Sequence, residues 1–398
     1  MMISEKLPLK TYLYFLAQSI NLTAAVMSVT MVAVIGAQLA PSPQWSTLPY
    51  GMQFLSLMIA TYPASKFMSL YGRRAGFHMG NLSLALSGVT GFHALQTGSF
   101  NWLLISHAAL GSYIAFANFN RFAATDGVGD ALKAKAISLV VAGGVVAAFI
   151  GPLVATSLRS AGGFSDFALC YGFFVPLAIV SAAVNQMTPV AEIKHVGDRA
   201  TPELLRTRSS RDLAPPIVIA AMGYGLMNLL MIQASLQMAA MHTHFQTIGT
   251  VIQWHVFAMF APSFVTGYLI SRMGINILIV LGLGLLSLSA LINLLHLSES
   301  SIWIALVVLG LGWNFTYVAG GALLAQRLGD HKDAMKIQGI NDLVIAVLAT
   351  AGAFLPGMLL VWLGWSGTNA GVAILALGLI GYFLVSIRRN ARFAEVDQ

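Results

Sequence analysis

Polar side chains recur in the middle of long apolar stretches of this sequence. Most are asparagine or glutamine, joined by one histidine and two aromatic residues that can also form hydrogen bonds. Because a polar group inside hydrocarbon is costly, each is a candidate for binding a small, largely neutral solute. The candidates are Gln18, Asn21, Gln53, Asn118, Asn228, Gln233, His255, Trp313, Asn314 and Tyr317. Each amide could instead join two neighbouring helices, at about 0.6 kcal/mol per hydrogen bond.

Charged residues form a second group near the ends of the same stretches. Arg73, Arg121, Asp126, Arg272 and Asp342 are candidates for gating or coupling. Asp342 is the only acidic residue that we place inside a membrane span, so it could carry a coupling proton or lock a gate by pairing with a cation. Arg121 could pair at the surface, act as a gate charge or anchor an anionic group.

Catalytic chemistry is not indicated by any motif. The sequence lacks a nucleotide-binding glycine-rich loop with Lys-Ser or Lys-Thr and a Gly-x-Ser-x-Gly elbow, so we expect neither an enzyme nor an ATP-driven pump. His242 and His244 follow Met238 and Met241, and thioether with imidazole could bind a soft metal. Without a nearby cysteine or acid, a solvated loop is the simpler interpretation. We expect no bound metal and no cofactor.

The candidate residues must be positioned by membrane-spanning helices. Of 398 residues, 57% are hydrophobic and 9% are charged, whereas a soluble domain carries about 25% charged residues. Crossing the bilayer takes roughly 20 apolar residues in a helix, and these runs are too long and too uniformly apolar for barrel strands. We therefore predict an all-α membrane protein with twelve transmembrane helices, near 11–38, 48–70, 75–96, 101–123, 136–158, 166–186, 215–239, 248–270, 275–296, 301–325, 337–362 and 368–387.

Lysine and arginine residues occupy alternate loops between these runs. The basic loops and ends include Lys6, Lys10, Arg73, Arg74, Arg272, Arg388 and Arg389, whereas the opposite loops hold only Arg159. The positive-inside rule then predicts that both chain ends are cytoplasmic. This loop pattern explains the net charge of +7, so we expect no nucleic acid partner.

One long polar segment divides the chain. Residues 187–214 separate 1–186 from 215–398, and we predict a six-helix bundle in each half with a cytoplasmic linker between them. The segment SKFMSLYG at 65–72 resembles GYLISRMG at 267–274, and Gly-Asp pairs occur at 129–130 and 329–330. This spacing indicates an internal duplication. Two parallel six-helix repeats around a central site are typical of transporters.

The segment at 267–274 resembles the loop motif of the major facilitator superfamily, Gly-x-Leu-Ala-Asp-Arg-x-Gly-Arg-Arg. The matching residues are Gly267, Leu269, Arg272 and Gly274 in the second half, and Gly72, Arg73 and Arg74 in the first. The resemblance implies a latch between the halves on the cytoplasmic side. Ser69 and Ser271 replace the motif's aspartate, so the gate is weak or another acid, such as Asp126 or Asp342, supplies the ion pair.

The glycines of these segments have separate expected roles. Gly267 would allow close helix approach, and Gly72 and Gly274 would permit a tight turn into the next helix. A further stretch, AGGVVAAFIGP at 142–152, is similar to the Gly-Pro motif of the superfamily's antiporters. It indicates either ordinary close packing, with Pro152 bending the helix, or an antiporter, which would favour export.

The resemblance implies secondary active transport by alternating access around a central cavity. We expect a monomeric, multi-pass protein of a bacterial inner membrane that exports a small neutral or amphipathic solute in exchange for protons. Its partners would be the solute, the coupling proton and the lipid bilayer. Import of a metabolite or metal chelate is the alternative, and a membrane receptor that has lost transport is a third.

Overall fold

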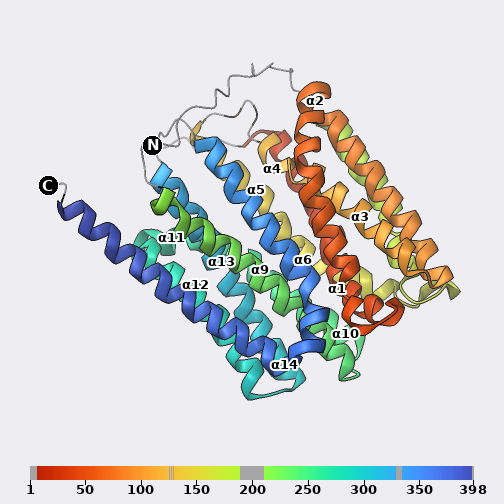
Figure 1. Ribbon diagram of the computed structural model, residues 1–398. Helices are drawn as coiled ribbons and strands as arrows, with labels where there is room; N and C mark the ends of the chain where they lie inside the picture. Colours follow the sequence, from red (N-terminus) through yellow and green to blue (C-terminus); the bar gives the residue numbers. More distant parts are fainter. Residues whose placement is uncertain are drawn as a thin grey trace. The chain divides into compact units, whose positions relative to one another are not determined.

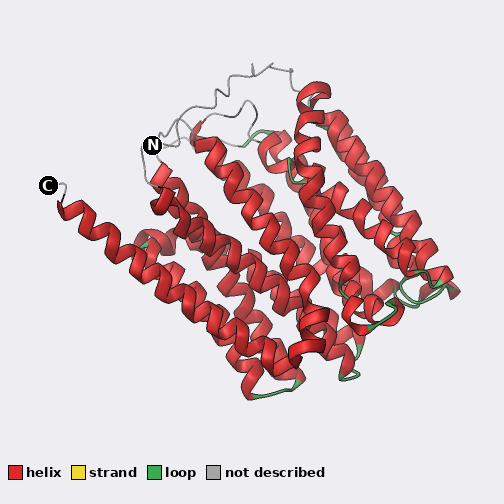
Figure 2. Cartoon of the chain, viewed as in Figure 1, coloured by secondary structure: helices red, strands yellow, loops and turns green. Residues whose placement is uncertain are grey.

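The computed structural model describes residues 7–124, 126, 128, 130–188, 210–328 and 334–396. All regular structure in these residues is helical (Figure 2). Most of the predicted linker 187–214 lies outside the described residues, as do Gly129 and the Gly-Asp pair at 329–330.

The helices follow the apolar runs of the sequence. Their bounds are α1 Leu9–Leu39, α2 Leu48–Thr97, α3 Phe100–Ala117, α4 Asn120–Ala123, α5 Asp130–Val141, α6 Gly143–Leu158, α7 Ala168–Gly172, α8 Phe174–Met187, α9 Ser210–Ala240, α10 Phe245–Phe260, α11 Ser263–Met273, α12 Ile275–Leu295, α13 Glu299–Leu328 and α14 Ala334–Val396, with short 3-10 turns at Pro43–Trp45 and Ala161–Gly163. Within the described residues, eight stretches are long and apolar enough to cross a membrane, or nine if α10 and α11 form one broken span.

Glycines in the left-handed region divide the longest helical segments. Gly72 (φ +84°) interrupts α2, Gly364 (φ +68°) interrupts α14, and Gly274 (φ +89°) separates α11 from α12. A side chain with a Cβ rarely adopts such a φ, so glycine is required at these turns. The predicted tight turns at Gly72 and Gly274 are therefore confirmed.

The chain forms two compact units, each described by itself. Unit 1 comprises the described residues of 1–195 and 235–261, and unit 2 those of 196–234 and 262–398. In unit 1, α1 packs against α5, α6, α8 and α10, while α2 packs against α3 (Figure 1). In unit 2, α12 packs against α11, α13 and α14.

Close backbone approaches hold the helices of each unit together. A Cβ added at Gly111 would lie 2.0 Å from the carbonyl oxygen of Gln53, and one at Gly352 would lie 2.2 Å from that of Gly225. Small residues permit such contacts between membrane helices. The expected close approach at Gly267 is wrong, because no described atom outside its own helix turn lies within 4 Å of an added Cβ.

The small residues of the 142–152 stretch pack against α1. An added Cβ at Gly143 would meet the backbone nitrogen of Ser19 at 3.0 Å, and one at Gly151 would meet the Val26 side chain at 2.8 Å. This confirms the interpretation as close packing. Pro152 lies inside α6, and this span is interrupted at Ala142, between α5 and α6.

Candidate functional site

Four amide side chains gather in unit 1 and form what we call the amide cluster: Gln18, Asn21, Asn118 and Asn120. Nδ2 of Asn21 lies 3.4 Å from both Oε1 of Gln18 and Oδ1 of Asn118, and Nδ2 of Asn120 donates to Oε1 of Gln18 at 3.3 Å. Three of the four side chains are buried, and Asn118 is half-buried. Within the described residues, Oδ1 of Asn21 and Oδ1 of Asn120 accept no hydrogen bond. An unpaired buried acceptor is unfavourable, so the cluster retains capacity to bind a donor.

A break in the helix positions this cluster. The helix α3 ends at Ala117 and α4 starts at Asn120, with the intervening residues in a tighter turn, where Phe119 N donates to Phe116 O at 3.2 Å. In a continuous helix, residues two apart would point roughly 200° apart. Sequence reasoning expected Asn118 and missed Asn120 for this reason.

Gln53 belongs to a separate buried network in unit 1. Its Oε1 accepts from Ser28 Oγ at 2.7 Å and lies 3.2 Å from Nδ1 of His107, whose Nε2 lies 2.8 Å from the Tyr171 hydroxyl. All four residues are buried. The network joins α1, α2, α3 and α7, so Gln53 makes interhelical contacts. His255 is also buried, on α10.

Three aromatic residues of unit 2 form what we call the aromatic cluster: Tyr224, Trp313 and Tyr317. The rings of Trp313 and Tyr317 are stacked, with centroids 5.0 Å apart and planes inclined by 10°. Tyr224 on α9 meets both rings edge to face, at 5.6 and 5.9 Å. Tyr224 and Tyr317 keep part of their surface exposed, whereas Trp313 is buried. Sequence reasoning named Trp313 and Tyr317 but missed Tyr224, which lies one turn before Asn228.

The predicted amides of unit 2 differ in their partners. Asn228 Nδ2 donates to the carbonyl oxygen of Ala349 at 3.1 Å, which joins α9 to α14. Asn314 accepts from Thr266 Oγ1 and donates to Ser263 Oγ, each at 2.7 Å, which joins α13 to α11. Gln233 is fully buried, and neither of its amide atoms has a partner within the described part of the chain. It lies nine residues from Tyr224, about half a turn around α9, so it is not part of the aromatic cluster.

The charged candidates lie in different surroundings. Arg73 and Asp126 form an ion pair, with Nη2 3.1 Å from Oδ1, and the Lys10 ammonium donates to the Asp126 carbonyl. Arg121 is half-buried, and its Cζ lies 4.7 Å from the ring centroid of Phe122. Within the described residues, the ion-pair partner of Asp126 is therefore Arg73 and not Arg121.

The corresponding positions of the second half make weaker contacts. Arg272 contacts the Tyr268 hydroxyl at 3.2 Å, and exposed Asp342 accepts from Asn341 at 3.2 Å. Ser69 and Ser271 each donate to the backbone carbonyl three residues earlier, at 2.8 Å. Both serines at the latch position therefore bond their own helix.

Comparison with known proteins identifies the family. The riboflavin transporter RfnT of Brucella anthropi is 32% identical over 363 residues, which cover 89% of each chain. Two Bacillus subtilis proteins named as uncharacterized MFS-type transporters, YdeG and YddS, are 28% and 23% identical and align with 89% and 91% of this chain and with 84% and 87% of their own. The chain belongs to the major facilitator superfamily. No family model matches it.

A solved structure supports the same fold. The nucleoside transporter NupG superposes with a TM-score of 0.68 at 12% identity, covering 95% of this chain and 99% of NupG. At that identity the likeness concerns the fold alone. Together with its apolar helices, the relatives make this chain a multi-pass membrane transporter of the superfamily, with a small molecule as its substrate.

Proposed function

We propose that this transporter moves a neutral solute that carries a flat heteroaromatic ring and several hydroxyl groups, as riboflavin does. The observation that carries the proposal is the aromatic cluster, where half-buried Tyr224 and Tyr317 offer ring surface of the kind on which a planar ring stacks, and buried Trp313 supports Tyr317 from beneath by stacking on it. The 32% identical relative is named for riboflavin, which makes a flavin the first solute to test.

The amide cluster of unit 1, taken by itself, offers acceptors to the polar groups of a neutral solute. Its open acceptors, Oδ1 of Asn21 and Oδ1 of Asn120, suit hydroxyl or amide donors. Neither cluster contains a charged side chain, which favours a neutral solute over an ionic one. Whether each amide binds solute or only joins helices is decided by substitution.

We propose that transport is secondary active and proceeds by alternating access, with protons as the coupling ion and export as the direction. Asp126 and Asp342 are the candidate proton or gate groups, together with Arg73, Arg121 and Arg272. Import of the same solute is the alternative. We further propose a monomer in a bacterial inner membrane with both chain ends cytoplasmic and bundles at 1–186 and 215–398.

Flavin binding by matched tryptophan variants tests the proposal. Flavin fluorescence is quenched on stacking, so riboflavin is titrated into purified wild type, Trp313→Leu and Trp303→Leu. Trp303 lies on the same helix but is 42% exposed and outside the aromatic cluster. We expect about tenfold weaker binding for Trp313→Leu, since loss of ring contact and buried area amounts to roughly 1–2 kcal/mol, and no change for Trp303→Leu. Equal binding by all three proteins would refute the assignment.

A further inference from the structure

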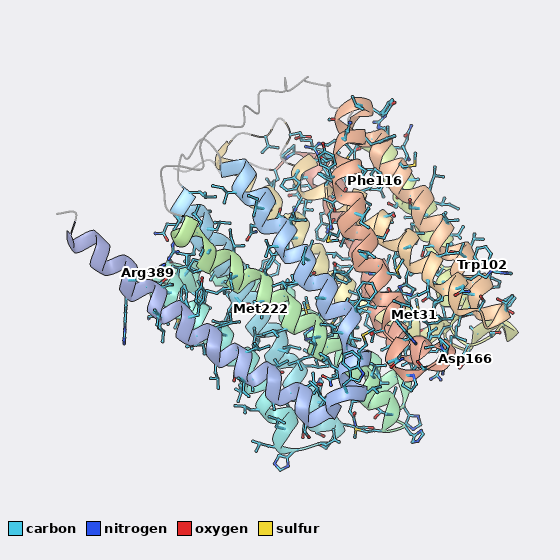
Figure 3. All side chains as sticks on the ribbon, viewed as in Figure 1. Met31, Trp102, Phe116, Asp166, Met222 and Arg389 are labelled. Atoms are coloured by element: carbon cyan, nitrogen blue, oxygen red, sulfur yellow. The ribbon has the colours of Figure 1, made fainter. Side chains whose placement is uncertain are left out.

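Two cavities open at one end of unit 1, and the proposed transport chemistry uses neither. Their volumes are about 260 and 450 Å³. Arg159 and Phe245 line both, His242 lines the smaller, and His244 lines the larger. Asp166, the ion-pair partner of Arg159, marks this end of unit 1, opposite the end marked by Phe116 (Figure 3).

Arg159 is held in a fixed geometry between one acid and two rings. Its Nε lies 3.3 Å from Oδ2 of Asp166, and its Cζ lies 5.2 Å from the ring centroids of both Phe167 and Phe245. These two rings meet edge to face at 4.8 Å. The side chain is 34% exposed, and its terminal nitrogens donate to no described residue. A guanidinium with free N–H groups in a fixed fork is suited to binding a phosphate.

Backbone strain is concentrated at the same place. Within the described residues, Phe167 (φ +66°) and His242 (φ +59°) are the non-glycine residues with positive φ. Phe167 is fully buried, and its backbone N–H donates to the carbonyl of Arg159 at 2.7 Å. Such strain persists only where surrounding contacts enforce it, and it is enriched at binding sites.

The lining of the cavities is rich in hydrogen-bond donors. No carboxylate of the described residues lines either cavity, while Arg159, His242 and His244 do. Asp166 contacts Arg159 from outside this lining. An imidazole ring carries at least one N–H donor, and Ser157 adds a hydroxyl to the larger cavity.

We propose that this end of unit 1 binds a phosphate group, with Arg159 as the principal contact and His242 and His244 as further donors. Phe167 and Phe245 fix the guanidinium and offer an apolar edge to the remainder of the ligand. The phosphate could belong to a soluble phosphate ester or to a lipid headgroup, which share this chemistry. The site is independent of the flavin assignment.

Ligand-observed NMR with phenyl phosphate and its neutral counterpart benzyl alcohol tests this site. The protein is held in dodecyl maltoside micelles, whose detergent carries no phosphate. We expect phenyl phosphate to bind at least about tenfold more tightly than benzyl alcohol, and Arg159→Gln to weaken phenyl phosphate about tenfold, as loss of a charge-assisted bond predicts. Failure of the wild type to distinguish the two probes would overturn the proposal.

Asp166→Asn supplies the control for a merely structural ion pair. Removing the competing carboxylate should leave phenyl phosphate binding unchanged or tighter, whereas a structural role of the pair predicts equal losses in Asp166→Asn and Arg159→Gln. Equal losses would overturn the proposal. His242→Gly keeps the left-handed backbone and removes the imidazole, so we expect a folded protein with weaker binding, by about threefold. Unchanged binding in His242→Gly together with unchanged binding in Arg159→Gln would also reject the site.

Added phospholipid identifies the source of the phosphate. When phosphatidylglycerol is added to the micelles, a lipid-headgroup site would lose its phenyl phosphate signal through competition. A site for soluble phosphate esters would keep it. Both results support the phosphate chemistry if Arg159→Gln weakens the phenyl phosphate signal that is seen without phospholipid. A signal that is unchanged in Arg159→Gln would overturn the proposal.

Discussion

The indole ring of Trp313 lies nearly parallel to the phenol ring of Tyr317, with centroids 5.0 Å apart. The two residues are one helical turn apart on α13, so the backbone itself presets the stack. Tyr224 reaches the pair from α9 and packs edge-on against both rings. This arrangement is the physical basis of the proposed planar-ring site.

Two substitutions at Tyr317 separate ring surface from hydroxyl chemistry. Tyr317→Phe keeps the stacked ring, so we expect riboflavin transport within about twofold of wild type. Tyr317→Leu removes it and should lower transport about tenfold, since an aromatic pair contributes about 0.5–1.5 kcal/mol beyond its buried area. Initial rates in vesicles with matched protein levels measure both. Loss of transport in Tyr317→Phe would show that the hydroxyl, and not the ring, is needed.

The amide cluster gives a prediction that distinguishes solute binding from interhelical bonding. Asn21→Leu removes an open acceptor as well as two long hydrogen bonds of 3.4 Å. We expect transport to fall at least about tenfold while the melting temperature changes little, because such bonds contribute about 0.6 kcal/mol each. Asn228→Leu is the contrasting variant, because the amide of Asn228 joins α9 to α14 and its loss removes a bond between helices and not an open acceptor. A stable Asn21→Leu protein with normal transport would remove Asn21 from the site.

Gly111 and Gly284 predict opposite responses to alanine. A Cβ at Gly111 would lie 2.0 Å from the carbonyl oxygen of Gln53, whereas one at Gly284 meets nothing within 4 Å. Gly111→Ala should therefore destabilise unit 1, by about 1–3 kcal/mol as for other overpacked sites. Gly284→Ala should be neutral or slightly stabilising, because alanine is favoured within a helix. Thermal unfolding in detergent compares the two, and equal melting temperatures would contradict the described packing of α2 on α3.

The ion pair between Arg73 and Asp126 predicts a larger effect on transport than on stability. Both side chains are partly exposed, at 28% and 37%, so the pair contributes about 0–1 kcal/mol to folding. Asp126→Asn should leave the melting temperature nearly unchanged and lower the transport rate severalfold if the pair acts in gating. The charge-exchanged variant Arg73→Asp with Asp126→Arg should recover part of the rate. No recovery would assign the two residues separate roles.

Much of the fold could be predicted because its determinants are local in the sequence. Apolar runs specify helices, and a positive φ at Gly72 and Gly274 follows from glycine at the turns between them. The site was less accessible to prediction. Asn228 and Asn314 share their residue type with Asn21, and only the structure reveals that their amides join helices.

Two contacts illustrate why spacing alone was insufficient. The helix break after Ala117 brings Asn120 to Gln18, although a regular helix would turn it away from Asn118. Tyr224 belongs with Trp313 and Tyr317 through a contact between helices far apart in sequence. Such juxtapositions depend on helix register, which hydropathy does not encode.

Counterflow in proteoliposomes tests the central claim most directly. Vesicles that contain the purified wild-type protein are loaded with unlabelled riboflavin and diluted into a trace of labelled riboflavin. We predict transient accumulation of label above that of protein-free vesicles, independent of an ion gradient, and its loss in Trp313→Leu but not in Trp303→Leu. A wild-type protein of intact fold that produces no accumulation of riboflavin would contradict the account.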